Sequence, residues 1–270
     1  GLPAILSKKA EIPAISVPVG NKTNHTAKRH HQERVIHQLL HTIDLQRRYS
    51  AMTRQTFLKY QPLPIDTPPP NVTEFYKGPR WDFWEWYAGS AGVSRAVASL
   101  KTSAGRSLIA GPPISREYGW ELSNPTHQAV LRDLQRAKRP RVLMIEPTCG
   151  PWSNSNTNMT AGDLEQIRRC EMIALTFSRE AVENQASRGD DFLMEQPRAS
   201  ELLKLPVAKY DTLSGFLPDQ FCDMCAHGLQ DPENHMPNKK PSTLRGSVML
   251  NRSNRSCDGS HEHAFTGSTQ

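Results

Sequence analysis

A short apolar run that ends in two prolines places the strongest constraint on how this chain can fold. Residues 141–153 read RVLMIEPTCGPWS, and residues 142–145 form the apolar part. Four consecutive apolar side chains are typical of a parallel strand that is covered on both faces. Pro147 and Pro151 prevent the strand from continuing, so it delivers Cys149 beyond its carboxyl end, where open α/β sheets bind ligands. Taken alone, the pattern is equally compatible with an ordinary loop cysteine.

Segments with strand and helix patterns alternate around this run. Further strands are predicted at residues 81–87, 107–110 and 192–194, and helices at residues 93–100, 125–138 and 160–187. The helical segments repeat their apolar residues with a period of 3.6. This alternation predicts an α/β fold with a Rossmann-like, doubly wound and mostly parallel sheet.

The chain is predicted to have three parts. Residues 1–78 form an arm with one amphipathic helix at 27–59 and a proline-rich linker, residues 79–215 form the α/β core, and residues 216–270 complete it. Four histidines, His30, His31, His37 and His41, accompany the apolar face of the arm helix. Their helical spacing favours a packing helix over a metal site.

The basic character of the chain belongs to the arm. Residues 1–80 carry 12 Lys or Arg against 5 Asp or Glu, whereas the remainder carries 21 against 22. Such an arm is compatible with a contact to nucleic acid or to another anionic surface. A solvated tail also explains the positive charge, and this interpretation is slightly favoured over a contact to an anionic surface.

The sequence lacks the segments that are typical of membrane proteins and of secreted proteins. The sequence contains no apolar stretch long enough to cross a bilayer and does not start with a secretory signal pattern. We therefore expect an intracellular protein, nuclear if its source is a eukaryote, that is not secreted and has no membrane partner. The five cysteines argue for free thiols or a metal site rather than a disulfide scaffold. The oligomeric state stays open.

A glycine-containing turn follows the strand predicted at 81–87. It reads Ala88-Gly89-Ser90-Ala91-Gly92 and leads directly into the helix predicted at 93–100. A strand, a glycine turn and a helix allow backbone amides and a helix N-terminus to approach a nucleotide-like ligand. An ordinary βα turn has the same pattern.

Three motifs, in this order, resemble those of C5-cytosine DNA methyltransferases of the class I S-adenosylmethionine-dependent fold. Residues 87–92 are similar to the first motif, an aromatic residue followed by Ala-Gly-x-Gly-Gly, with Ala91 at the middle glycine. Residues 147–153 are similar to the nucleophile motif Pro-Pro-Cys-x-Pro-Phe-Ser, and residues 195–197, EQP, to the Glu-Asn-Val or Glu-Asn-Pro motif. The resemblance covers residues 81–197, and it extends to methyltransferase-like segments of retroelement polyproteins.

The resemblance implies methyl transfer from S-adenosylmethionine to C5 of cytosine. Cys149 would add to C6 of the ring as a thiolate, and Glu195 would hold a proton at N3. The base would be flipped out of the duplex to reach them, and the polar loop 153–159 would close over it. DNA is favoured over RNA as the substrate.

The resemblance also assigns binding residues. It places the donor near Tyr87, Gly89, Gly92 and Pro147. Glu117 is the candidate for the ribose hydroxyls and Glu121 for the adenine amine, although both also fit solvent-exposed loop charges. Ser153 and Arg245 are the candidates for contacts to the substrate.

Two parts of the family pattern are missing. The chain contains no Gln-x-Arg-x-Arg segment and no evident target-recognition region. A recognition element elsewhere in a longer chain, or a substrate read differently, would explain this. The alternative function is a catalytically degenerate, retroelement-derived module that binds nucleic acid or a protein partner.

A group of cysteines and histidines near the C-terminus has the spacing of zinc ligands. The pattern is CxxCxH at residues 222–227, followed by CxxxHxH at residues 257–263. Thiolates and imidazoles are the usual ligands of tetrahedral zinc. The preferred set is Cys225, Cys257, His261 and His263, with Cys222 as the main rival. Buried thiols beside an unattached histidine-rich tail are the alternative.

Overall fold

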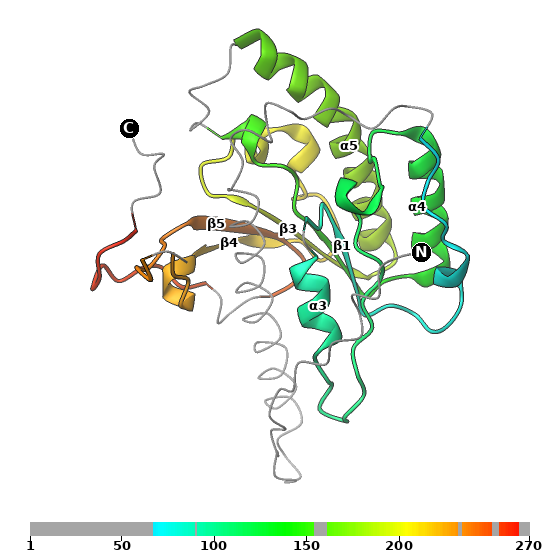
Figure 1. Ribbon diagram of the computed structural model, residues 1–270, viewed down its shortest axis with the longest axis horizontal. Coiled ribbons are helices and arrows are strands. Elements are labelled where there is room, and N and C mark those ends of the chain that lie inside the picture. The colour runs from blue at the N-terminus through cyan, green and yellow to red at the C-terminus, as the bar shows by residue number, and fades with distance from the viewer. Residues whose placement is uncertain (1–66, 90, 154–160, 232–233, 250–253, 265–270) are drawn as a thin grey trace.

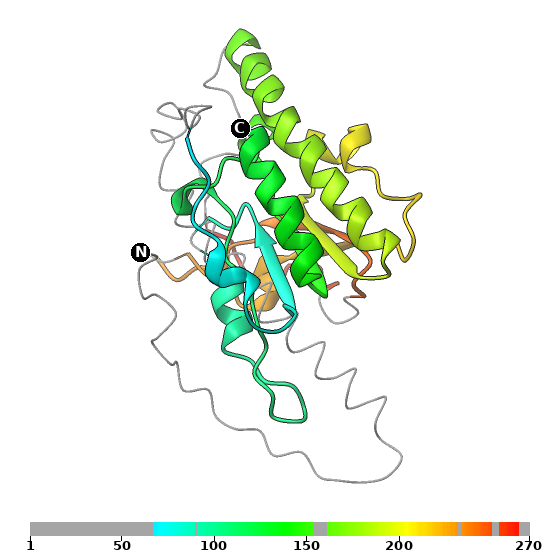
Figure 2. The same cartoon turned by 90° about the vertical axis from the view of Figure 1, so that its right-hand side faces the viewer.

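The structure, a computed structural model, contains an open mixed sheet with helices on both faces (Figure 1). It describes residues 67–89, 91–153, 161–231, 234–249 and 254–264. The helix predicted at 27–59, with its four histidines, lies outside the described residues. Figure 2 shows α4 and α5 side by side along one face of the sheet.

The sheet has five strands in the order β1-β2-β3-β5-β4. Their bounds are β1 Phe83–Trp86, β2 Val142–Ile145, β3 Asp191–Pro197, β4 Leu217–Asp223 and β5 Pro241–Gly246. Strands β1, β2 and β3 are parallel neighbours, whereas β5 is antiparallel to both β3 and β4. The prediction of a mostly parallel sheet is therefore correct only for the first three strands.

The antiparallel half of the sheet was not predicted, because its sequence carries weak strand signals. Strand β5 begins with Pro241 and ends with Gly246, and β4 has Pro218 near its start. Proline and glycine weaken a strand assignment made from sequence. An irregular register between Leu217 and Gln220 further obscures the alternation in β4.

The strand predicted at 107–110 is wrong as a regular strand. This segment lies beside β1 and forms isolated parallel bridges, from Phe83 to Ala110 and from Trp86 to Ile114. Pro112 and Pro113 separate the two bridges. Since proline has no backbone N–H to donate, a continuous ladder cannot form there.

Within the part of the chain that the structure describes, three helices accompany the sheet, with bounds close to those predicted. They are α3 Gly92–Ala98, α4 Pro125–Lys138 and α5 Ala161–Ser187. The side chain of Asn124 accepts a hydrogen bond from the Thr126 amide and caps α4, which has Pro125 in its first turn. Arg139 ends this helix in the left-handed conformation, and Pro140 follows it.

The sheet separates two apolar clusters. On the face covered by α4 and α5, Trp84, Trp86, Leu143, Ile145, Phe192 and Met194 are buried with helix side chains. On the face covered by α3, the intervening Phe83, Met144 and Leu193 pack with Val93 and Val97. Covering on both faces explains why residues 142–145 are uniformly apolar.

Among the described residues, no helix combines the length and apolar character that a membrane span requires.

We predict that Phe177→Ala destabilises the fold by about 3–5 kcal/mol, because it removes a buried aromatic side chain. Phe177 is 3% exposed and stacks on Trp86 with ring centroids 5.0 Å apart. The matched control is Ile173→Ala, one helical turn away and 54% exposed, for which we expect a change under about 0.5 kcal/mol. Denaturant unfolding of both variants measures the difference, and equal effects would contradict this packing.

Candidate functional site

The parallel register places the carboxyl ends of β1 and β2 level with Met194 of β3. Trp86 is paired with Ile145, and Ile145 with Met194. The next residue of each strand therefore reaches the same edge of the sheet: Tyr87, Glu146 and Glu195. This is the edge at which ligands bind in open α/β sheets.

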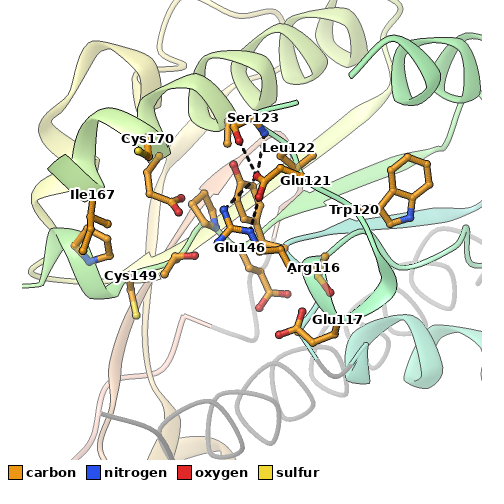
Figure 3. Close-up of a pocket in the computed structure, with 18 residues that line it drawn as sticks. Arg116, Glu117, Trp120, Glu121, Leu122, Ser123, Glu146, Cys149, Ile167 and Cys170 are labelled. Atoms are coloured by element: carbon orange, nitrogen blue, oxygen red, sulfur yellow. Dashed lines mark hydrogen bonds and ion pairs between the residues drawn. The ribbon is translucent and has the colours of Figure 1, made fainter. Parts of the chain in front are cut away.

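A cavity of about 300 Å³ opens at this edge (Figure 3). Its volume is at the lower end of the range for small-molecule sites. It brings together six of the residues assigned from sequence: Tyr87, Gly89, Glu117, Glu121, Pro147 and Cys149. The other lining residues are Ser115, Arg116, Trp120, Leu122, Ser123, Glu146, Thr148, Pro151, Ile167, Cys170, Glu171 and Ala174.

The residues that line the cavity extend from the turn that carries Cys149 to the loop that precedes α4. Figure 3 shows Cys149 and Ile167 at one end and Trp120 and Glu117 at the other. All the buried residues of α5 lie from Glu171 onward. The first half of this helix thus extends past the sheet, and its side chains form a wall of the cavity.

The turn that carries Cys149 is held by contacts with α5. Cys149 directly precedes the 3-10 helix η4 (Gly150–Trp152), and its carbonyl accepts a hydrogen bond from the Trp152 amide. The Trp152 side chain is buried, and the Arg168 guanidinium lies 5.1 Å from its ring centroid. Arg168 also donates a hydrogen bond of 2.8 Å to the Pro151 carbonyl. These contacts fix the turn while leaving Cys149 partly exposed.

The glycine turn has an unusual backbone. Tyr87, Gly89 and Ala91 all have φ between 48° and 60°. This is the left-handed region, which is unfavourable for residues other than glycine. Ala91 stands where the motif has a glycine, and its backbone has the conformation that glycine adopts most easily. The Glu85 carboxylate accepts hydrogen bonds from the Ser94 amide and hydroxyl, at 2.7 and 2.6 Å. It thereby anchors the first turn of α3, with Gly92 at its start, to β1.

The Tyr87 side chain points toward α5. Its hydroxyl is 2.9 Å from the Ser178 hydroxyl. Burial, and then the nearby Glu171 carboxylate, raise the pKa of Tyr87 well above its ordinary value. Tyr87 is therefore a neutral hydrogen-bonding group and not a base near neutral pH.

Glu121 lines the cavity with its carboxylate already engaged. One oxygen is 2.8 Å from Arg116 Nε, and the other accepts a hydrogen bond of 2.8 Å from the Ser123 hydroxyl (Figure 3). The same Arg116 is the basic residue among those that line the cavity. Glu117, the second predicted acidic contact, is exposed.

Three buried polar lining residues were missed from sequence: Glu146, Glu171 and Ser115. All are at least nine-tenths buried. Burial raises the pKa of Glu171, an effect that nearby Arg116 partly opposes. The Ser115 hydroxyl has no hydrogen-bond partner among the described residues. Only the position of Glu146, at the end of an apolar strand, was a usable sequence signal.

Glu195 is buried in β3 beside the cavity and is not one of the residues that line it. The next residue, Gln196, connects this strand to the turn that carries Cys149. Its amide donates a hydrogen bond of 2.6 Å to the Pro147 carbonyl and its oxygen accepts one from Ser200. Gln196 is therefore a positioning residue between the two strand ends.

The two predicted substrate contacts lie outside the set of lining residues. Arg245 forms a bidentate ion pair with Asp219, at 2.8 and 2.6 Å, and donates to the carbonyls of Leu203 and Ala208. These contacts give Arg245 a structural role. Ser153 follows η4, and the rest of the loop predicted to close over the base, residues 154–159, lies outside the described residues.

The predicted Cys/His group is assembled at the end of β4. One ligand atom from each of Cys225, Cys257, His261 and His263 lies within 4.8 Å of the others, so the group could hold a metal ion. The rival, Cys222, is fully buried in the apolar cluster on the α3 face. Burial and the adjacent Cys257 raise the pKa of the Cys225 thiol to about 11.

Comparisons with known proteins leave the chain without an assigned relative. No protein-family model, curated protein or solved structure matches it.

The raised pKa of Glu171 predicts a pH-dependent stability difference for Glu171→Gln. Between the ordinary pKa of 4.5 and the raised folded value, the folded state binds more protons than the unfolded state. The unfolding free energy of the wild type therefore falls as pH rises through this window. Glutamine removes that loss, so we expect a higher Tm for the variant at about pH 8 and no difference below about pH 4. Calorimetry across this range is the measurement, and a pH-independent difference would contradict the assignment.

Proposed function

We propose that the protein transfers a methyl group from S-adenosylmethionine to C5 of cytosine in DNA, on a Rossmann-like fold. One observation carries the proposal: Cys149 and the glycine turn line a single acidic cavity at the carboxyl ends of parallel strands. The cavity also contains the acidic residues assigned to the donor from sequence.

The charge of the cavity supports a cationic ligand. Its lining includes four carboxyl groups, from Glu117, Glu121, Glu146 and Glu171, against the single Arg116. Since Arg116 is already paired with Glu121, little positive charge remains to bind a phosphate. S-adenosylmethionine carries a sulfonium and an ammonium group, and both are attracted to carboxylates. A nucleoside di- or triphosphate would be repelled.

The shape and polarity of the cavity support an adenosine-containing donor. Trp120 provides an aromatic wall at the end distant from Cys149. Ser115, 8% exposed, offers a buried hydroxyl to a polar group of the ligand. The methyl-bearing end would then lie toward Cys149 and the turn at 87–92.

The chain supplies a nucleophile and a proton-holding group for cytosine chemistry. The Cys149 thiolate would form a bond to C6 while Glu195 holds the proton at N3, so that C5 becomes electron-rich. C5 then forms a bond to the methyl group as the bond from that group to the sulfonium sulfur of the donor breaks, and the donor leaves as a neutral thioether. Loss of the C5 proton to solvent and release of the Cys149 thiolate then restore the aromatic ring.

A second candidate is a module that keeps the donor cavity without transferring a methyl group. The structural ion pair of Arg245 with Asp219 favours it, because this arginine was the nearest candidate to steady the target base. This module would bind the donor and form no covalent bond to cytosine.

Covalent trapping tests methyl transfer. Cytosine with fluorine at C5 blocks the release of the cysteine, so we expect a donor-dependent adduct between DNA and Cys149 that is lost in Cys149→Ser. Cys170→Ser is the matched control, because Cys170 is the other thiol lining the cavity, and it should keep the adduct. Mass spectrometry locates the modified residue. Donor binding without any adduct, in DNA and in RNA, would replace this proposal with the non-catalytic module.

The charge argument predicts how the cavity discriminates between two ligands. We expect Glu171→Gln to weaken S-adenosylmethionine about fivefold, as one charge interaction of about 1 kcal/mol would. S-adenosylhomocysteine, which lacks the sulfonium charge, should change less than about twofold. Glu165→Gln, an exposed acid on the same helix outside the cavity, should change neither. Calorimetric titration measures both affinities, and an equal loss for the two ligands would contradict the charge argument.

A further inference from the structure

The C-terminal segment 254–264 is attached to the domain with very little apolar burial. The structure assigns it no helix or strand, and Ala264 is its one buried residue among those described. Three other side chains are partly buried, namely Cys257, His261 and His263. All remaining residues of the segment are exposed. The side chains that turn inward are therefore those that carry sulfur and imidazole groups.

These groups converge on a thiol from another part of the chain. Cys257 Sγ lies 3.3 Å from His263 Nε2 and 3.6 Å from His261 Nε2. Cys225, in the short 3-10 helix after β4 (Met224–His227), completes the group. Such separations match the edges of a small tetrahedron around an ion with bonds of about 2.0–2.3 Å.

We propose that Cys225, Cys257, His261 and His263 bind one zinc ion, and that this ion fastens residues 254–264 to the sheet and stabilises the end of β3. Two thiolates with two imidazoles are typical of structural zinc, whereas calcium and magnesium prefer oxygen ligands. The four protein ligands leave no open position for catalysis. Binding releases the thiol protons to solvent and involves no electron transfer.

Asp223 connects the metal group to β4. Its carboxylate accepts a hydrogen bond of 2.8 Å from the Cys257 amide, and its own amide donates to the Arg255 carbonyl, also at 2.8 Å. The side chain is 3% exposed. Hydrogen bonds of this kind, from a residue that does not itself bind the metal, fix the orientation of a metal-binding loop.

The same carboxylate connects the metal group to β3. Arg198 Nη2 lies 3.3 Å from the other Asp223 oxygen, and the Arg198 amide donates to the Pro241 carbonyl. Arg198 follows Pro197, the last residue of β3, and is three residues from Glu195. An ion that fixes Cys257 therefore also fixes Asp223 and, through Arg198, restrains the last residues of β3, the strand that carries Glu195.

Metal analysis of the full chain tests the binding site. We expect about one zinc per chain after expression with added zinc, and a loss of most of it in Cys225→Ser and in Cys257→Ser. Cys170→Ser, which changes an exposed thiol outside the group, should retain the zinc. A wild type with less than about 0.2 zinc per chain, or ligand variants with unchanged zinc, would overturn the proposal.

Reversible removal of the metal tests its structural role without relying on variants that fail to fold. We expect a chelator to speed tryptic cleavage after Arg255 at least tenfold, and added zinc to restore protection. Hydrogen exchange at the amides of Gln196 and Arg198 should rise on metal removal, while exchange in β2 stays unchanged. Unchanged cleavage or unchanged exchange at these two amides in the metal-free protein would overturn the proposed role. Both readouts are independent of methyl transfer.

Discussion

The backbone register between three parallel strands is the constraint on which the rest of the structure depends. Trp86, Ile145 and Met194 lie at one level of the hydrogen-bonded ladder, so three separate parts of the chain reach one edge together. A shift by one residue would exchange the two faces of a strand and bury different side chains. Because apolar clusters cover both faces, the register is fixed by packing as well as by hydrogen bonds.

The strand ends combine a rigid framework with several buried acidic groups. Glu85 anchors α3, Gln196 joins two strand ends, and Arg168 holds the turn that carries Cys149. Glu171, by contrast, has a raised pKa because burial disfavours its charged form. Burying the charged form of Glu171 costs stability, and the same cavity contains Cys149 on a turn fixed by hydrogen bonds. Such a combination is more typical of a ligand-binding site than of a part of the structure that only stabilises the fold. This contrast links the geometry to the proposed binding of a cationic donor.

The antiparallel half of the sheet extends this edge to the C-terminus. Strand β5 lies between β3 and β4, so β4 runs in the same direction as β3 and also ends near this edge. Gly246 permits the close approach of β5, because a Cβ atom there would collide with the Phe192 carbonyl. The Cys/His group after β4 is therefore joined, through Asp223 and Arg198, to the strand that carries Glu195.

The sequence alone predicted the three parallel strands and the position of Cys149 after one of them, although it also predicted a strand at residues 107–110 that forms only isolated bridges. Uninterrupted apolar residues, glycine and proline turns, and helical periodicity are local signals, and they predicted β2, α4 and α5 with nearly correct bounds. The spacing of thiols and imidazoles likewise predicted the Cys/His group, with Cys222 as the rival of Cys225. Only the tertiary structure decided between Cys225 and Cys222, brought Glu171 and Ser115 into the cavity, and gave Arg245 a structural ion pair. These outcomes depend on which residues distant in sequence become neighbours, and no local pattern encodes that.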